Sequence, residues 1–140
     1  ERAFAQKFYL EMIFMAKRRC FSVDFFENEK FLTLNDKSKV LYFGLLLHSD
    51  DDGVVINPTA IMRLLKKQKK YFDELVENGF VMRINDVFVI KHWNLHNKIQ
   101  PSKKTPTLYQ DEIKKLLLSQ TGEYELKTEM FRKNCGFPAD

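Results

Sequence analysis

The order of the segments in the middle of this chain constrains its fold more than any other feature. An apolar stretch that is typical of a buried helix covers residues 35–48 and leads into an Asp-Asp-Asp-Gly turn at residues 50–53. A short apolar run follows at residues 54–56. Asn57 and Pro58 then form a helix start, because Asn caps a helix and Pro suits its first position. These signals predict a helix, a short strand and a second helix in succession.

The next segments continue this order. A basic run at residues 66–70 leads into a third helix, which an Asn-Gly pair ends because both residues tolerate left-handed backbone. Two β-rich runs at residues 80–84 and 87–92 are joined by an Asn-Asp pair, which suits the turn of a hairpin. The order helix, strand, helix, helix, hairpin predicts an α+β, mainly helical fold. It is that of a winged helix-turn-helix, here with an extra C-terminal helical segment.

The chain divides into four predicted parts. Residues 1–16 form an N-terminal extension with apolar residues at helical spacing. The extension ends beside a sequence that reads like a translation start, so it is a native helix, upstream read-through or an added segment. The winged-helix domain covers residues 17–94 and a basic polar arm covers residues 95–107. The helical C-terminal segment covers residues 108–140. Its two predicted helices cover residues 109–120 and 123–133.

Composition narrows the class of protein. With 140 residues, 44% of them hydrophobic and 14% aromatic, the chain has enough apolar mass for a core. A formal net charge of +4 and a pI of about 9.0 favour nucleic acid or another acidic partner only weakly. Two distant cysteines match neither a disulfide framework nor a structural zinc site, so reduced thiols in the cytoplasm are expected. No apolar run approaches the roughly 18 residues of a membrane span, so no membrane partner is expected.

A basic cluster before the third helix is the main candidate site. Five cations fall in eight residues without an acid among them: Arg63, Lys66, Lys67, Lys69 and Lys70. In a winged helix, the start of the third helix enters the major groove and the turn before it contacts phosphate. The cluster therefore predicts DNA contacts, with Thr59 beside it, although a solvated helical face is the alternative. Because Asp73, Glu74 and Glu77 follow on the same helix and would repel phosphates, contact by the helix start alone is expected.

Further phosphate contacts are expected from the polar arm, the N-terminal basic pair and the tip of the hairpin. These residues are Lys98, Lys103, Lys104, Arg18, Arg19 and Asn85. Lysines spaced among small polar residues suit contacts to the DNA backbone, with an affinity that falls as salt rises. The alternative for the arm is a flexible linker that is basic by chance.

Other patterns do not predict chemistry. The acidic turn at residues 50–53 has Thr59 where a calcium loop needs a bidentate Glu, so a plain turn is expected. His92 and His96 leave a strand with no Glu between them, which disfavours a zinc site. Trp93, between them, is expected to cover the core at the base of the hairpin. Nucleophile-elbow and phosphate-loop motifs do not occur, so neither an enzyme nor a cofactor is predicted.

Several stretches in unbroken order resemble the N-terminal winged-helix domain of replisome-organiser and DnaD-like replication initiation proteins from phages of Gram-positive bacteria. The matching stretches are residues 17–22, 31–34, 41–43, 50–55, 57–58, 78–81, 87–93 and 97–99, with Thr107 and Tyr109. The resemblance covers about two thirds of the chain and lies in the combination, since no single stretch is specific. It implies DNA binding at an origin or a replication fork, self-association, and contact with helicase-loading proteins.

The sequence thus predicts a double-stranded DNA-binding protein that acts in phage- or plasmid-type replication initiation in the cytoplasm of a bacterial host. Two alternatives stay open: a protein-interaction or oligomerisation module of a replisome, with residues 109–118 as a dimer face, and a transcriptional regulator on the same scaffold. A DNA binder is expected to carry one basic face that joins residues 66–70 to residues 98–104. An interaction module is expected to expose an apolar patch of several hundred Å² instead.

Overall fold

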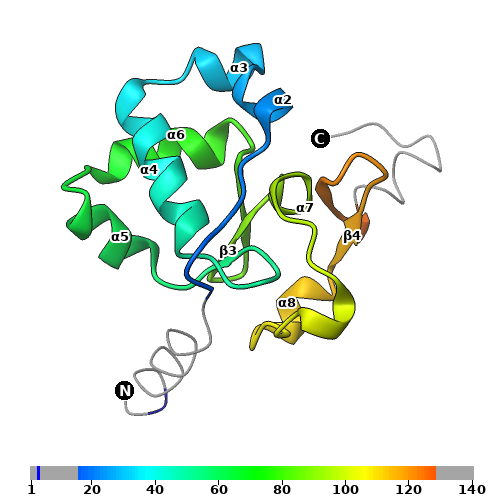
Figure 1. The fold of residues 1–140 in the computed structure, drawn as a ribbon. Helices are drawn as coiled ribbons and strands as arrows, with labels where there is room; N and C mark the ends of the chain where they lie inside the picture. Colours follow the sequence, from blue (N-terminus) through cyan, green and yellow to red (C-terminus); the bar gives the residue numbers. More distant parts are fainter. Residues whose placement is uncertain (1–2, 4–15, 129–140) are drawn as a thin grey trace.

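The computed structural model describes residue 3 and residues 16–128 of the chain (Figure 1). The nature of the N-terminal extension over residues 1–16 and the part of the last predicted helix beyond residue 128 therefore lie outside the described residues. Within these bounds the fold is of the α+β type, with short helices and two small antiparallel sheets. In the described part, no helix is both long enough and apolar enough to cross a membrane.

Two short helices follow the N-terminal basic pair. α2 spans Val23–Phe26 and α3 spans Glu29–Leu32. The side chain of Asn28 accepts hydrogen bonds from backbone N–H groups in the first turn of α3. Because an N-cap residue has extended rather than helical backbone, Asn28 interrupts the helical run and starts it again.

α4 spans Asp36–Leu47 and is surrounded by other elements, as its apolar sequence predicts. Asn35 caps its first turn, which confirms the predicted start. Leu41, Tyr42 and Leu45 are completely buried. The helix contacts both of the helices that follow it, so it needs apolar side chains on more than one face.

The next three elements follow in the predicted order: β1 spans Val54–Val55, α5 spans Pro58–Leu64 and α6 spans Lys69–Glu77. The predicted cap of α5 is confirmed, since the side chain of Asn57 accepts a hydrogen bond within the first turn. Gly79 follows α6 with a φ of 78°, in the left-handed region that glycine adopts without strain. The predicted Asn-Gly stop is therefore confirmed as well.

A β-hairpin follows α6 and completes a three-stranded sheet. β2 spans Val81–Ile84, β3 spans Val87–Ile90, and Asn85 in the two-residue turn has a φ of 55°. β3 pairs antiparallel with both β1 and β2, so the strand order is β1-β3-β2. The strand that precedes α5 thus lies next to the last strand of the hairpin, and the two helices between them pack with α4 on the side opposite the C-terminal elements (Figure 1).

The C-terminal part differs from the prediction. The chain forms three short helical turns and then a second hairpin. The turns are α7 at Trp93–His96, η1 at Pro101–Lys103 and α8 at Gln110–Ile113. The hairpin consists of β4 at Leu116–Leu118 and β5 at Tyr124–Leu126. The long helix predicted over residues 109–120, on which the dimer face at residues 109–118 depends, is therefore not formed: α8 covers only its first part and the chain continues as a strand.

Tertiary contacts explain the second hairpin. The apolar triplet at Leu116–Leu118 is compatible with either a helix or a strand, and the Thr-Gly pair that follows supplies a turn in which Gly122 has a φ of 88°. Tyr124 is buried; its hydroxyl donates a hydrogen bond to the carbonyl of Asp52 at 2.7 Å and its N–H donates to the carbonyl of Lys91. These anchors, distant in sequence, hold the segment as a strand.

The core is built around aromatic rings. Phe25 and Tyr42 are stacked with ring centroids 5.3 Å apart, and Phe31 and Phe80 make edge contacts to Tyr42. Trp93 is completely buried at the base of the first hairpin, as predicted. Its ring nitrogen donates to a backbone carbonyl of the acidic turn, so this buried polar atom is satisfied.

The acidic turn at residues 50–53 is an organising point of the fold, and the prediction of a turn is confirmed. One carboxylate oxygen of Asp50 accepts hydrogen bonds from the N–H groups of Asp52 and Val54. Gly53 has a φ of 87°, and a Cβ there would lie 2.5 Å from a ring carbon of Trp93. Both the backbone conformation and the close packing therefore require glycine.

Candidate nucleic-acid interface

The five cations predicted as the main site lie on α5, on the turn after it and on the first turn of α6. Arg63, Lys66, Lys69 and Lys70 are exposed and Lys67 is half-buried. Among the described residues, none of the five forms an ion pair. Lys66 has a φ of 55°, which turns the chain sharply between the two helices. The structure thus presents an unneutralised positive charge on one short stretch of surface.

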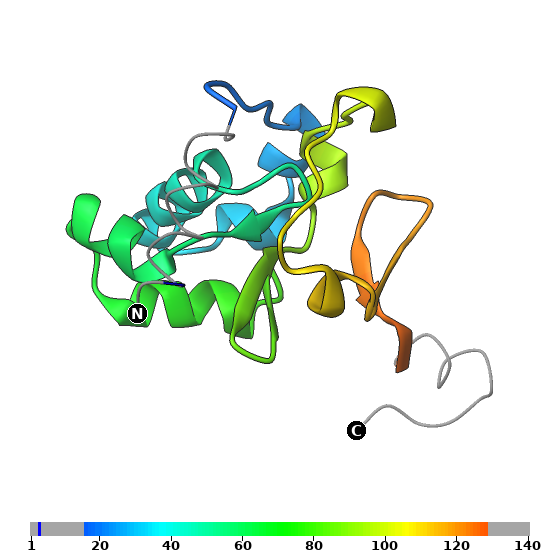
Figure 2. The same cartoon turned by 90° about the horizontal axis from the view of Figure 1, so that it is seen from below.

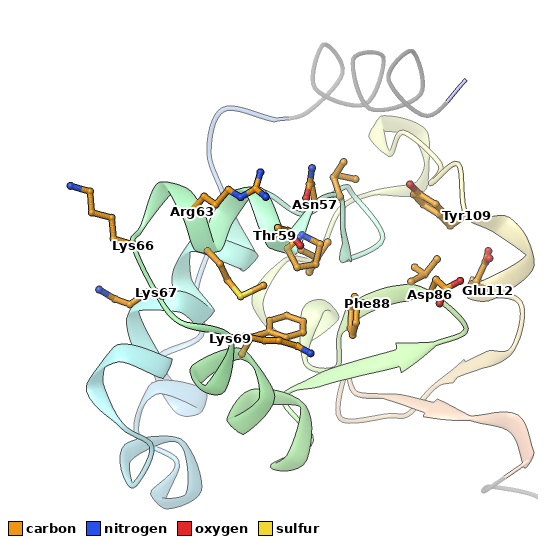
Figure 3. Close-up of a pocket in the computed structure, with 16 residues that line it drawn as sticks. Asn57, Thr59, Arg63, Lys66, Lys67, Lys69, Asp86, Phe88, Tyr109 and Glu112 are labelled. Atoms are coloured by element: carbon orange, nitrogen blue, oxygen red, sulfur yellow. The ribbon is translucent and has the colours of Figure 1, made fainter. Parts of the chain in front are cut away.

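A groove of about 860 Å³ lies beside these cations and extends to the first hairpin and α8 (Figure 3). Its floor is apolar and includes Met62, Phe72 and Phe88; the last two rings meet edge to face at 4.9 Å. Lys66 and Lys67 stand at one end of the view in Figure 3, while Asp86 and Glu112 stand at the other. Thr59, also predicted as a contact, is exposed and lines the same groove.

The start of α6 has free hydrogen-bonding capacity. Gln68 is its N-cap residue, and its side chain makes no cap hydrogen bond. The first N–H groups of a helix lack partners within the helix and carry the positive end of its dipole, so they favour an anion. The first turn of α6 contains Lys69 and Lys70 and no acid, which adds to this preference.

One of the three acids on α6 is engaged within the protein, which lessens the repulsion of DNA expected from this helix. A carboxylate oxygen of Glu74 accepts a hydrogen bond at 2.9 Å from the N–H of Asn35, the cap residue of α4. Glu74 therefore joins two helices rather than facing solvent alone. Asp73 is half-buried and Glu77 is exposed at the end of the helix, away from its basic first turn.

The tip of the first hairpin is less basic than a DNA-contacting wing requires. Asn85 is exposed, as its proposed role needs. Beside it Arg83 lies 3.5 Å from the Asp86 carboxylate, and its Nε donates a hydrogen bond to the Asn85 carbonyl. Because these two charges offset each other, the tip offers hydrogen-bonding groups but little net charge.

Arg19 is a correction to the predicted contacts. Its side chain is only 3% exposed, and its guanidinium pairs with the Asp51 carboxylate at 2.8 Å. The same group donates to the Ser49 carbonyl and lies over the Trp93 ring at 4.9 Å. A guanidinium engaged in this way has no free face for phosphate, so Arg19 stabilises the fold. Arg18 next to it is exposed.

The basic arm is held against the acidic turn. Lys104 pairs with the Asp52 carboxylate, and the N–H of Thr107 donates to the same carboxylate. The N–H of Thr105 donates to Asp51. The flexible-linker alternative is therefore wrong for this part of the arm, and the charge of Lys104 is neutralised within the molecule.

The two other lysines of the arm, Lys98 and Lys103, are exposed. They belong to the yellow-green and yellow stretch around η1, which lies on the opposite side of the molecule from α5 in both views (Figures 1 and 2). The expected single basic face from residues 66–70 to residues 98–104 is therefore not formed.

His96, the last residue of α7, is buried in the core. The N–H of Ser22 donates to Nδ1 of His96 at 2.9 Å, which leaves the proton of a neutral ring on Nε2, 2.9 Å from the Tyr42 hydroxyl. Burial, with a further contribution from the nearby His92, lowers the pKa of His96 to about 4, so the ring is neutral at neutral pH. Within the described part of the chain, no three His, Cys, Asp or Glu side chains gather in a way that could hold a metal ion.

Lys37 and Tyr71, which lie beside the basic cluster, escaped the sequence analysis. Lys37, on the first turn of α4, and Lys70 place their ammonium groups 5.4 Å and 5.2 Å from the ring centroid of Tyr71. Lys37 precedes Tyr71 by half the length of the domain, and the pattern around it reads as an ordinary helix start. No local signal in the sequence joins the two residues.

Comparison with family models, with curated proteins and with solved structures gave no match to this chain.

Proposed function

We propose that the chain is a winged helix-turn-helix protein that binds double-stranded DNA. The proposal is supported by the element order α4, β1, α5, α6, β2, β3 and by the strand order β1-β3-β2. In such a fold the short first strand closes the sheet against the hairpin, and the third helix is free to enter the major groove. Here α4, α5 and α6 take the places of the three helices.

The unpaired cations of the α5–α6 stretch are the observation that carries this proposal. Five neighbouring positive charges repel one another and attract an anionic partner, whereas Arg19 and Lys104 of the same chain are paired internally. Exposed lysines bind phosphates as point charges and release counterions from DNA on binding. Because few of the side chains here could read base edges, most of the affinity would come from the DNA backbone.

The process in which the protein acts is proposed from the resemblance to phage replication initiation domains. On that basis the protein acts in phage- or plasmid-type replication initiation in the bacterial cytoplasm, with self-association and helicase-loading proteins as further partners. Selection of bound duplexes from a fragmented replicon would test this step. Enrichment of a segment from the replication origin is expected, whereas uniform recovery of all fragments would contradict a role at an origin.

The first experiment is a salt titration of binding to a random-sequence duplex of about 20 base pairs, followed by fluorescence anisotropy. Four or five phosphate contacts predict a slope of about −4 in a plot of log affinity against log salt between about 50 and 200 mM. The test variant changes Lys66, Lys67, Lys69 and Lys70 to Ala. The matched control changes four other exposed lysines to Ala: Lys98, Lys103, Lys114 and Lys127.

The control separates a specific site from general charge, because both variants lose the same charge. A steep slope that only the test variant loses supports the proposal. An equal loss in both variants, or no binding by the natural chain at the lowest salt, contradicts it.

The groove favours a second candidate function, which is the docking of a protein segment. Its floor is apolar and its two ends carry opposite charges, so it is complementary to a peptide that is acidic at one end and basic at the other. A labelled peptide of this charge pattern is the probe. This candidate is favoured if the natural chain binds the peptide but not duplex DNA, and if Met62→Glu abolishes peptide binding. DNA binding without peptide binding would exclude it.

A further inference from the structure

Tyr71 lies between two ammonium groups at the junction of α4 and α6. The amine of Lys37 comes from the first turn of α4 and the amine of Lys70 from the first turn of α6, and each lies within 5.4 Å of the ring centroid. Both lysines are exposed and Tyr71 is partly exposed. A phenol and two cations thus meet at one point on the surface.

Hydrogen bonds fix this junction. Ser38 is completely buried, and its hydroxyl donates to the carbonyl of Tyr71 at 3.1 Å. A second hydrogen bond joins the N–H of Asn35 to the carboxylate of Glu74 at 2.9 Å. The first turns of α4 and α6 are therefore held side by side, so the backbone of Lys37 stays close to Tyr71.

The nearby acids do not neutralise this cluster. Asp36 lies 3.4 Å from Lys39 rather than from Lys37. Glu74 accepts the hydrogen bond from Asn35. Burial raises the pKa of Tyr71, but hydrogen bonds to Lys37 and Lys70 together with their charges outweigh this effect and leave the pKa below its ordinary value. The surroundings of the phenol are therefore positive overall.

We propose that Lys37, Tyr71 and Lys70 form a binding site for a backbone phosphate of the duplex held by the α5–α6 cations. The two ammonium groups attract the negative charge of the phosphate, and the Tyr71 hydroxyl donates a hydrogen bond to a phosphate oxygen. This inference rests on the proposed DNA binding and extends it, because it adds α4 and an aromatic side chain to the contact surface. Lys70 connects the new site to the basic cluster along the first turn of α6.

Two variants with different signatures test the site by the same anisotropy titration. Lys37→Ala removes one phosphate-bound cation, so the salt slope should become shallower by about 0.9 and the dissociation constant should rise several-fold at about 100 mM salt. Tyr71→Phe keeps the ring and both cations but removes the hydroxyl. It should weaken binding about two- to five-fold with the slope unchanged, because a neutral hydrogen bond releases no counterion.

Lys114→Ala is the matched control, since this exposed lysine lies on neither the groove nor the α4–α6 junction. Thermal melting of each variant checks that the fold is retained. A natural chain that binds DNA with a steep slope, while Lys37→Ala and Tyr71→Phe behave like Lys114→Ala, would overturn the site and leave the proposed function standing. Failure of the natural chain to bind DNA would overturn both.

Discussion

Two charged turns of this molecule use their charge in opposite ways. The acidic turn at residues 50–53 directs its carboxylates inward, to Arg19, to Lys104 and to backbone N–H groups. The basic stretch at residues 63–70 makes no ion pair with any described residue and stays at the surface. The comparison teaches that a run of like charge in a sequence has no fixed meaning. Its role depends on whether the fold brings counter-charges to it, and these come from distant segments.

The largest expected effect is on DNA affinity. Changing Lys66, Lys67, Lys69 and Lys70 to Ala should lower the affinity for duplex DNA by about a thousand-fold at about 100 mM salt, since each lost contact removes about 0.9 from the slope. The melting temperature should change little, because these side chains form no ion pair with any described residue and only Lys70 contacts a ring, that of Tyr71. Anisotropy and circular dichroism measure the two quantities. Unfolding of the variant would show that the basic stretch stabilises the fold, as the acidic turn does, and would contradict the difference drawn between the two turns.

The next largest effect concerns the acidic turn. Arg19→Met retains much of the volume and packing of the side chain but removes the charge beside Asp51, which leaves a buried carboxylate without its cation. The free energy of unfolding should fall by about 3 kcal/mol in urea titrations. DNA affinity of the folded protein should be unchanged. Weaker DNA binding at full stability would mean that Arg19 contacts phosphate after all.

Asp50 provides a smaller and pH-dependent effect. Burial raises the pKa of its carboxyl to about 6, and this effect outweighs the hydrogen bonds that the carboxyl accepts. The folded state therefore binds a proton at Asp50 more tightly than the unfolded state does, so protonation of Asp50 adds to the free energy of unfolding at low pH. That contribution is lost as the pH rises from about 4 through about 6. Asp50→Asn should stabilise the protein at pH 7 by about 1 to 2 kcal/mol, because the neutral amide keeps an oxygen acceptor.

Urea titrations of both proteins at pH 7 and at about pH 4.5, which is near the ordinary pKa of Asp, check this expectation. The advantage of Asp50→Asn should shrink toward the lower pH, where the natural carboxyl is protonated. An advantage that is equal at both values, or a loss of stability at pH 7, would show that the Asp50 charge is satisfied in the fold.

The smallest expected effect comes from the arm. Lys98→Ala combined with Lys103→Ala should change DNA affinity by less than about two-fold, because the stretch around η1 lies across the molecule from α5 (Figures 1 and 2). The same anisotropy titration measures this change. A loss comparable to that of two lysines from the α5–α6 stretch would mean that DNA reaches around to the arm.

The middle of the fold was predictable because its signals are local. Asn35 and Asn57 cap the helices that they precede, and the Asn-Gly pair ends α6, all within one turn of the element concerned. The C-terminal hairpin was not predictable, because its leucine triplet suits a helix equally well. What decides the outcome is the contact of Tyr124 with Asp52, 72 residues earlier in the chain.

The candidate site divides in the same way. The basic cluster could be found because its five residues fall within eight positions of the sequence. The internal role of Arg19 could not be found, since its partner Asp51 lies 32 residues away. Neither could the cluster of Lys37 with Tyr71, which depends on how α4 packs against α6. Contacts of this kind depend on the assembled fold, and no pattern within one segment reports them.

The most direct test of the central claim is a nuclear magnetic resonance titration of the labelled protein with a duplex of about 20 base pairs, which reports every backbone N–H separately. The α5–α6 stretch is expected to show the largest shift changes, strongest at Lys66, Lys67 and the first turn of α6, while the N–H groups of residues 50–53 stay unchanged. Shift changes confined to the acidic turn and the arm, or no changes at low salt, would contradict the claim that the unpaired cations form a DNA-binding surface.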